Sequence, residues 1–548
     1  MNNTKSSQVL KGVRKSWSVG SVEFNPNTLP LDLLNHHRQT PKLLSQSILE
    51  DPLFAHIKPL AKTLLEIPPG RAFLNCDYDV DGTTSASILK LVLESMGWTV
   101  EIFIPDRVIH EYGTNQDLIT KAAHNGASLI ICADCGSTDL PFLSYIAKEF
   151  DTEVMVIDHH RFLNGLCDGV HFFNPHQFPE INPTHYCTAS ICCLLAHAMA
   201  SELSRVAALL PTIEILTGIA AIADVVSVCS PVNRNSILRV ISPERHPLKD
   251  TLKALIKESQ FTTSNIAFSV VPALNAAGRL SQASQLIQLF TGERAQQFQV
   301  LSKIKDLNTL RKQYQEQVVM EALKMVQPGE EILITASRSW NPGVVGPAAG
   351  QLCEKLGIPV VLGGYNELKK KFIFSGRSTE SIDLYTELKR AGEGLPISRI
   401  GGHSVALGMT IEELHAREVV TALRKRFKTT NHHCTSTSSA FCKIPYDSLD
   451  LKWIEDFKKL EPFGVGFKAP LFVLDLPVAQ PFSALGKTGT HLAYKGTTSS
   501  RNRVEILAFH AADIQLQLVN SKQLVVELGV GEYAGKSSVQ AFVKDVII

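Results

Sequence analysis

Acidic residues and histidines occur in two short patterns whose types and spacing could do chemistry together. Three aspartates alternate in DYDVDG, residues 77–82, and two histidines follow an aspartate in VIDHH, residues 156–160. The first pattern matches the opening half of an EF-hand calcium loop, which requires a bidentate glutamate at its twelfth position and a helix on each side. The twelfth position is Ile88, and residues 72–74 before the loop form an apolar run typical of a strand. The acids therefore need an explanation other than a calcium loop.

These residue types also indicate which metal ions would suit them. Carboxylate and imidazole ligands without thiolates fit Mn²⁺ or Mg²⁺. Carboxylates that converge on one spot repel each other, and bound cations relieve that repulsion. Four groups are enough for one ion, so a larger set of acids indicates two. Two bridged ions commonly activate a water molecule and stabilise the leaving oxygen in phosphoester hydrolysis.

Residues 71–160 alternate short apolar runs with amphipathic segments. This alternation predicts a parallel sheet with helices on both faces, in which ligands bind beyond the carboxyl ends of the strands. Four of the runs end in polar residues, which are Asp77, Asp79 and Asp81; Arg107; Asp134; and Asp158, His159 and His160. We therefore expect these side chains to converge at one edge of the sheet.

The rest of the chain divides into several regions. Residues 1–70 contain seven prolines and are predicted to be an irregular and helical lead-in. Residues 188–330 are mainly helical, and strand and helix signals resume up to about residue 428 as a second α/β domain. Within 300–325, a stripe with a 3.6-residue period predicts a core-facing helix of roughly 40 Å that links two domains. The stripe consists of Val300, Ile304, Leu307, Leu310, Tyr314 and Val318.

A polar segment, TTNHHCTSTSSA at residues 429–440, favours a linker or an exposed loop. His432-His433-Cys434 within it could bind a metal, but its Ser/Thr-rich surroundings favour a solvated loop. The strands that follow predict an all-β module of roughly 100 residues that is compatible with an OB-type barrel.

The composition describes a folded protein of three or four domains without a strong overall charge. The 54 Lys+Arg and 53 Asp+Glu residues nearly balance, so any basic surface must be local. Residues 209–226 contain a proline and two acids, which favours a buried helix over a membrane span. The N-terminus lacks the apolar run of a secretory signal. Eleven scattered cysteines, including Cys132 and Cys135, indicate reduced thiols and a cytoplasmic location.

Several segments resemble the DHH phosphoesterase superfamily. DYDVDG, ADCG at 133–136, VIDHH and IADVV at 222–226 are similar to its four motifs. Further segments are similar, in the same order, to the RecJ family of bacterial exonucleases, and they lie at 104–115, 271–280, 340–352, 375–378, 399–410 and 460–472. The resemblance extends from about residue 70 to the end of the sequence.

The resemblance implies an α/β fold class with two α/β domains joined by a long helix, followed by a C-terminal OB-type β-barrel. The implied regions are a DHH catalytic domain at 71–230, a helical connector at 231–328, a DHHA1 domain at 329–428, a linker at 429–444 and an OB domain at 445–548. Two departures stand out. The family usually has a glycine directly after the acid of the segment at 110–113, whereas Tyr112 follows Glu111 here, and the extra C-terminal domain of some family members is not expected.

The resemblance also implies a two-metal site. Its ligands would be Asp79, Asp81, Asp134, His159 and Asp224. Asp134 would bridge the ions, and Asp77 would be a further ligand or a supporting group. His160 would face the scissile phosphate as a charge stabiliser or proton donor, so the implied catalytic residues are His160, Asp134 and Asp81. For each acid taken alone, the alternative is a strand-end cap or a solvated turn.

Six further residues match positions that contact nucleic acid in the family, namely Arg107, Arg279, Ser375, Arg377, Gly402 and His403. Arginine forks bind phosphate oxygens through two parallel hydrogen bonds, and a closed pocket for a terminal 5′-phosphate would explain selectivity for strand ends. Alternatively, Arg279 or Arg377 would form an ion pair between domains, and His403 would be a buried core residue.

Preference for single strands would come from a narrow passage between the two α/β domains and from the OB module, which would follow the backbone and stack bases. Candidate stacking residues are Phe463, Phe467, Phe472, Tyr494 and Phe509, most of which also suit a barrel core. The basic clusters at 368–372 and 423–428 would contact phosphates or form solvated helix faces.

The resulting expectation is a monomeric exonuclease that uses Mn²⁺ or Mg²⁺, with two ions, to hydrolyse single-stranded DNA 5′→3′ to mononucleotides in repair and recombination. A helicase and a single-strand-binding protein are the expected partners, and no membrane is. Two alternatives remain, a DHH phosphodiesterase for short oligonucleotides or cyclic dinucleotides and an inactive DNA-binding scaffold. The barrel argues against the first, and the complete acid set argues against the second.

Overall fold

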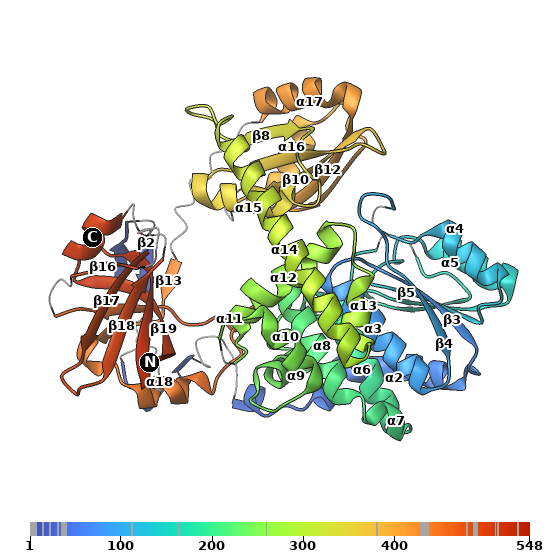
Figure 1. Ribbon diagram of the computed structural model, residues 1–548, viewed down its shortest axis with the longest axis horizontal. Helices are drawn as coiled ribbons and strands as arrows, with labels where there is room; N and C mark the ends of the chain where they lie inside the picture. The colour runs from blue at the N-terminus through green and yellow to red at the C-terminus, as the bar shows by residue number, and fades with distance from the viewer. Residues whose placement is uncertain are drawn as a thin grey trace. The chain divides into compact units, whose positions relative to one another are not determined.

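The computed structural model describes most of the chain as two compact units (Figure 1). One unit is formed from Ser47–His432, and the other from Met1–Gln46 together with His433–Ile548. The described residues are 8–13, 16–20, 24–29, 32–33, 41–110, 113–162, 165–258, 260–379, 382–427, 438–477, 481–485, 491–509, 511, 514–533 and 536–548.

A five-stranded parallel sheet, in the order β4-β3-β5-β6-β7, carries the predicted metal ligands. Its strands are β3 (Arg71–Cys76), β4 (Thr99–Phe103), β5 (Leu129–Ala133), β6 (Glu153–Ile157) and β7 (Val170–Phe173). The helices α4 (Gln116–His124) and α5 (Leu140–Phe150) share an apolar core with one face. The parallel sheet is confirmed, and because β3, β5 and β6 are neighbours, the acids that follow them meet at one edge.

A helical layer packs beside α3 (Val80–Ser95), which contacts α6 (Thr188–Ala200) and α8 (Leu210–Ala223). The prediction of a buried helix within 209–226 is confirmed by the burial of α8. Among the described residues, no helix is long and apolar enough to cross a membrane. The other helices of this layer are α2 (Phe54–Glu66), α7 (Ser204–Ala207), α9 (Pro231–Ile241), α10 (Pro247–Leu252), α11 (Thr263–Asn265), α12 (Val271–Arg279) and α13 (Gln285–Thr291).

The long linking helix is α14 (Arg294–Leu323), whose 30 residues span about 45 Å. The prediction that its whole apolar stripe faces a core is wrong at the centre, where Leu310 and Tyr314 are 37% and 36% exposed. Arg311 is the buried residue there, at 8% exposed. α14 packs against α10, α12 and α13 and also against α15 of the next domain, where Val318, Val319 and Ala322 share a core with α15. The central turns therefore pass between two cores rather than along one.

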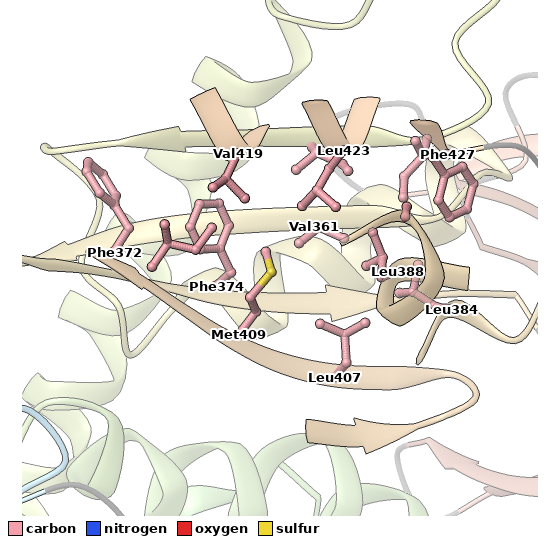
Figure 2. Close-up of a cluster of buried hydrophobic side chains, with 14 of the residues drawn as sticks. Val361, Phe372, Phe374, Leu384, Leu388, Leu407, Met409, Val419, Leu423 and Phe427 are labelled. Carbon is pink, nitrogen blue, oxygen red and sulfur yellow. The ribbon is translucent and has the colours of Figure 1, made fainter. Parts of the chain in front are cut away.

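The second α/β domain contains a five-stranded sheet in the order β11-β12-β10-β9-β8. Its strands are β8 (Leu333–Ser337), β9 (Val360–Asn366), β10 (Lys371–Arg377), β11 (Arg399–His403) and β12 (Ala406–Glu412). The helices are α15 (Val345–Leu356), α16 (Leu384–Ala391) and α17 (Glu413–Arg426). Figure 2 shows the core in which Val419 and Leu423 of α17 face Val361, Phe374 and Met409 of the sheet. This domain was predicted.

The other unit is built around a seven-stranded sheet in the order β14-β15-β19-β20-β18-β17-β16. Its strands are β14 (Cys442–Pro445), β15 (Phe472–Asp475), β16 (Ser483–Leu485), β17 (His491–Thr497), β18 (Arg503–Ala508), β19 (Gln523–Tyr533) and β20 (Lys536–Val546). Two helices, α18 (Leu451–Lys458) and α19 (Gln515–Asn520), accompany them, so the module is not purely β.

Two details of the predicted organisation are wrong. The lead-in is not only irregular and helical, because β1 (Gln8–Lys11) and β2 (Ser16–Val19) form a sheet with β13 (Ser438–Ala440). The segment predicted as a linker, 429–444, contains β13 and most of β14. Apolar side chains explain both differences, since Trp17 and Val19 are buried against the C-terminal sheet. His432-His433-Cys434 lies outside the described residues.

Candidate metal centre and nucleic-acid pocket

The DYDVDG segment forms a tight turn from β3 into α3. Asp79 caps the helix, and its Oδ1 accepts a hydrogen bond of 3.0 Å from the backbone N–H of Gly82. A Cβ at Gly82 would lie 2.5 Å from the carbonyl oxygen of Asp77, so only glycine lets the helix start this close to the loop. Because a strand precedes the turn, a calcium loop between two helices is excluded here.

The first turn of α6 holds two buried acids in place. The backbone N–H groups of Thr188 and Ala189 donate to the two carboxylate oxygens of Asp81 at 2.7 and 2.9 Å. The hydroxyl of Thr188 donates to Oδ1 of Asp134 at 3.1 Å. N–H groups at a helix start have no partner within the helix and carry a partial positive charge, so they suit carboxylates. Asp134 adopts φ 63, an uncommon conformation for a non-glycine residue.

His159 lies among three carboxylates that come from different elements. Its Nε2 is 3.4 Å from Oδ1 of Asp134 and 3.9 Å from Oδ2 of Asp81. Its Nδ1 is 3.8 Å from Oδ2 of Asp224, the residue that ends α8. Burial lowers the pKa of His159, which favours the neutral imidazole that binds metals. The structure thus brings His159, Asp81, Asp134 and Asp224 together as expected.

The neighbouring His160 has a different environment, because Asp158 supports it. Its Nδ1 is 2.8 Å from Oδ1 of Asp158, whose carboxylate also accepts the backbone N–H groups of His159, His160 and Ser137. Burial alone would lower the pKa of His160, but the hydrogen bond and charge of Asp158 raise it to about 9. Burial likewise opposes ionisation of Asp158, but the histidines lower its pKa to about 2. The raised pKa of His160 favours the cationic imidazole at neutral pH, and its side chain is 45% exposed.

The remaining acids destabilise one another in their charged forms. Burial raises the pKa of Asp134 far above its usual value, and the nearby charges of Asp81 and Asp79 raise it further. Burial and then Asp79 do the same to Asp77. The pKa of Asp224 rises to about 8 because of burial and of Asp81 and Asp79. Such a set needs positive charge to remain ionised at neutral pH.

The geometry of the cluster fits divalent cations. Three groups of ligand atoms each lie within 4.8 Å of one another, which are Asp77, Asp79 and Asp134; Asp81, His159 and Asp224; and Asp134, His159 and His160. Within the described residues, Oδ1 of Asp77 is buried without a hydrogen-bond partner. A buried carboxylate oxygen without a partner is costly unless a cation approaches it. All six predicted ligands fall in this cluster.

Three predicted arginines form a second cluster of the opposite charge. Burial lowers the pKa of Arg279 to about 9, and the charges of Arg107, Arg311 and Arg377 contribute. Burial and Arg107 also lower the pKa of Arg377. Nη1 of Arg279 donates to the carbonyl oxygen of Gly343 at 3.3 Å, so it makes a hydrogen bond to the second α/β domain. Cations crowded in this way suit an anion such as phosphate.

Of the other predicted contact residues, Ser375 and Gly402 lie near the arginines, whereas His403 does not line the same cavity. Oγ of Ser375 and Nη2 of Arg377 are 3.4 and 3.6 Å from where a Cβ of Gly346 would be, in the first turn of α15. Ser375, Gly402 and Arg107 line a cavity of about 390 Å³. His403 is exposed at the end of β11 and is not among the residues that line this cavity. The alternative of a buried core histidine is therefore wrong.

Two residues that the sequence analysis did not single out join these clusters. Thr188 contacts Asp81 through its backbone N–H and Asp134 through its hydroxyl, and the backbone contact leaves no mark in the sequence. Tyr78 lies between Asp77 and Asp79, and the guanidinium of Arg107 lies 5.3 Å from the centre of its ring. An aromatic residue between two candidate ligands was the available signal for Tyr78.

Three family models match the chain in the order that the fold displays. The N-terminal domain of the DHH family matches residues 72–221, the DHHA1 domain matches 329–429 and the RecJ OB domain matches 442–545. Residues 72–221 are thus similar to the DHH family, and the further matches to a DHHA1 domain and a RecJ OB domain agree with the resemblance found in the sequence.

Curated relatives that the chain matches carry the description single-stranded-DNA-specific exonuclease RecJ. The Bacillus subtilis relative is 27% identical over 86% of the chain, and the chain spans 60% of that relative's length. The Haemophilus influenzae relative is 24% identical over 85% of the chain and 86% of its own length. The Thermus thermophilus relative is 27% identical over 80% of the chain and 63% of its own length.

Two crystal structures of Thermus thermophilus RecJ share the fold. The complex with Mn²⁺ has a TM-score of 0.77 at 22% identity, covering 97% of this chain and 79% of the other. The complex with Mg²⁺ has a TM-score of 0.72 at 21% identity, covering 97% and 78%. The predicted fold class, with two α/β domains, a long helix and a C-terminal OB domain, is confirmed.

Proposed function

We propose that the chain is a metal-dependent exonuclease that hydrolyses single-stranded DNA from its 5′ end to mononucleotides. One observation carries the proposal: the acid–histidine cluster and the arginine cluster adjoin each other at Tyr78. The neighbours of Tyr78 in the sequence, Asp77 and Asp79, belong to the first cluster, and its ring contacts Arg107 of the second. The description of the curated relatives as single-stranded-DNA-specific exonucleases supports the substrate class.

The proposed cofactor is a pair of Mn²⁺ or Mg²⁺ ions held by Asp79, Asp81, Asp134, His159 and Asp224, with Asp77 beside them. The crowded carboxylates, the neutral His159 and the unpartnered oxygen of Asp77 support this assignment. RecJ structures with Mn²⁺ and with Mg²⁺ support the choice of ion. When bound, such ions supply an activated water molecule and charge that stabilises the leaving oxygen.

His160 is proposed to act on the scissile phosphate. Asp158 lies 2.8 Å from its Nδ1 and orients the ring, and a cationic imidazole carries an Nε2–H of the kind that donates to a phosphate oxygen. A cationic imidazole stabilises the negative charge that builds up during cleavage, and it can transfer a proton to the leaving oxygen. Asp158 keeps the ring both oriented and charged.

The arginine cluster is proposed to receive the terminal 5′-phosphate. Arg107, Arg279 and Arg377 supply the charge, and Ser375 supplies a hydroxyl. A phosphate with two or more negative charges relieves the mutual repulsion of the guanidinium groups. An internal phosphodiester carries a single charge and continues into another nucleotide, so it fits less well. Binding of the end would place the first phosphodiester at the neighbouring acid cluster.

The C-terminal module is proposed to hold the rest of the strand, which the match to the RecJ OB domain supports. Among the candidate stacking residues, Phe467 and Phe472 are buried, whereas Phe509 is 47% exposed and remains available. A monomeric state, a cytoplasmic location, a role in repair and recombination, and a helicase and single-strand-binding protein as partners complete the proposal. The domain boundaries at 71–230, 231–328 and 329–428 are proposed with it.

The polarity of digestion tests this function directly. A long single strand labelled at the 5′ or the 3′ end is incubated with the protein and Mn²⁺, with a blunt duplex as a control. We expect labelled mononucleotide to appear early only from the 5′-labelled single strand. Digestion from the 3′ end, equal digestion of the duplex, or full activity of Asp134→Ala protein would refute the proposal. Cleavage of short oligonucleotides alone would favour the phosphodiesterase alternative.

A further inference from the structure

The turn that carries Arg107 is held by a side chain of the other α/β domain. Asn366, the last residue of β9, is 1% exposed. Its Nδ2 donates a hydrogen bond of 2.8 Å to the carbonyl oxygen of Val108, which follows Arg107 in the sequence. Asn366 and Val108 both line the cavity of about 390 Å³ that also includes Arg107 and Ser375.

The partners of Asn366 determine how its amide is oriented. Its Oδ1 accepts the backbone N–H of Lys369 at 3.1 Å, within the turn that joins β9 to β10. An N–H group can pair only with the amide oxygen, and a carbonyl only with the amide nitrogen. One side chain therefore closes its own turn and reaches across to the DHH domain.

The segment around Arg107 is a compact turn that would move as a unit. Oδ1 of Asp106 accepts the backbone N–H groups of Val108 and Ile109 at 2.8 and 3.2 Å. The backbone N–H of Asp106 donates to Nδ1 of His110 at 3.0 Å. Because these bonds tie the turn to itself, a contact at Val108 also constrains the backbone position of Arg107.

We propose that Asn366 is a positioning residue that holds the Arg107 turn in place for the 5′-terminal phosphate. This inference rests on the proposed function of the arginine cluster and adds a residue that the sequence analysis did not assign. Asn366 lies in the DHHA1 domain and Arg107 in the DHH domain, so the amide makes binding of the strand end depend on both domains. It does not touch the reacting phosphodiester, and its loss affects binding rather than chemistry.

Two variants separate the contact from the folding of the turn. Asn366→Asp keeps the acceptor for Lys369 but loses the donor to Val108, whereas Asn366→Ala loses both. For a 5′-phosphorylated single strand, we expect KM to rise about tenfold in each variant while kcat stays within twofold, because the half-buried carbonyl of Val108 loses the side-chain donor that holds it. Thr421→Ala, an exposed change on α17 of the same domain, is the matched control.

A double-mutant cycle with Arg107→Ala tests whether Asn366 acts through that arginine. We expect Asn366→Asp to raise KM far less in the Arg107→Ala protein than in the wild type, since the residue it positions is gone. An unchanged KM in both Asn366 variants, or equal fold-changes in the two backgrounds, would overturn the proposal. A fall in kcat together with an unfolding midpoint below that of Thr421→Ala would also overturn it, because the role would then be structural.

Failure of the proposed role of Asn366 can be distinguished from failure of the proposed exonuclease function. If the wild-type protein degrades no strand, the exonuclease proposal fails. Binding of a 5′-phosphorylated strand, followed by fluorescence anisotropy in EDTA, then tests Asn366 without any cleavage. Weaker binding by Asn366→Asp than by Thr421→Ala supports the positioning role, and equal binding refutes it.

Discussion

The acid cluster and the arginine cluster solve the same physical problem with opposite charges. Each gathers like charges, and burial followed by mutual repulsion shifts their pKa values towards the neutral form, upward for Asp134 and Asp224 and downward for Arg279 and Arg377. The acids require cations, and the arginines require an anion. The first α/β domain and its helical layer supply all the acids, whereas the arginine cluster also draws Arg377 from the second α/β domain. The comparison indicates that cleavage depends on one domain and recognition of the strand end on two.

The largest expected effect comes from removing the carboxylate of Asp134, which belongs to two of the three groups of ligand atoms. Asp134→Asn should lower kcat roughly a thousandfold or more, because the neutral amide loses the charge that attracts the cations. Binding of single-stranded DNA in EDTA should remain within twofold, since the arginine cluster is intact. Rates on labelled single strands and anisotropy measure the two effects. Loss of DNA binding by Asp134→Asn would show that the clusters do not divide the work as described.

The converse change tests the arginine cluster. Arg377→Ala should raise KM for a 5′-phosphorylated strand tenfold to a hundredfold, because a hydrogen bond to a charged group contributes about 1.5–3 kcal/mol. A strand with a 5′-hydroxyl should be affected less, and kcat should change little. Steady-state kinetics on the two strands measure this difference. Equal losses on both strands would remove Arg377 from the terminal phosphate pocket.

The pH dependence of stability distinguishes the acids from the arginines in the absence of metal. The raised pKa of Asp224, about 8 against an ordinary 3.8, means that the folded state keeps a proton that the unfolded state loses. The free energy of unfolding in EDTA should therefore fall as pH rises from about 4 to about 8. Urea unfolding at several pH values measures the slope, and Asp224→Asn should reduce it. Added Mn²⁺ should also reduce the slope, and an identical slope with Mn²⁺ would contradict cation binding.

A smaller effect is expected at Thr188, which touches the acids without being one of the proposed ligands. Thr188→Val keeps the backbone bond to Asp81 but loses the hydroxyl bond to Asp134. Loss of a group that orients a metal ligand costs about tenfold in metal affinity or activity. Thr188→Ser should restore the activity, and the concentration of Mn²⁺ that gives half-maximal rate should rise only in the valine variant. Equal behaviour of the two variants would assign Thr188 to packing alone.

The two clusters also differ in how far the sequence alone could predict them. Asp77, Asp79, Asp81, Asp134 and His159 follow apolar runs, and the parallel sheet brings such strand ends together, so elementary rules sufficed. Asp224 follows a helix rather than a strand, and Arg279 and Arg377 lie about 100 residues apart in the sequence. Only the family resemblance therefore indicated these three residues.

The predictions that failed, and the contacts that were missed, depend on long-range packing or on backbone geometry. Leu310 and Tyr314 continue a perfect helical stripe, but periodicity does not tell where a helix leaves one core and enters another. The strands at Gln8–Lys11 and Ser16–Val19 are four residues each and pair with each other, and Ser16–Val19 also pairs with Ser438–Ala440, more than 400 residues away. The bonds from Thr188 and Ala189 to Asp81 come from the backbone, whose geometry at a helix start has no residue signature.

The central claim is that the acid cluster binds divalent cations independently of the arginine cluster. Titration of the metal-free protein with Mn²⁺, followed by isothermal calorimetry, measures the number of ions and their affinity. We expect two ions for the wild type and for Arg377→Ala, and weakened binding with fewer than two ions for Asp134→Asn. No Mn²⁺ binding by the wild type, or the same stoichiometry and affinity in Asp134→Asn, would contradict it.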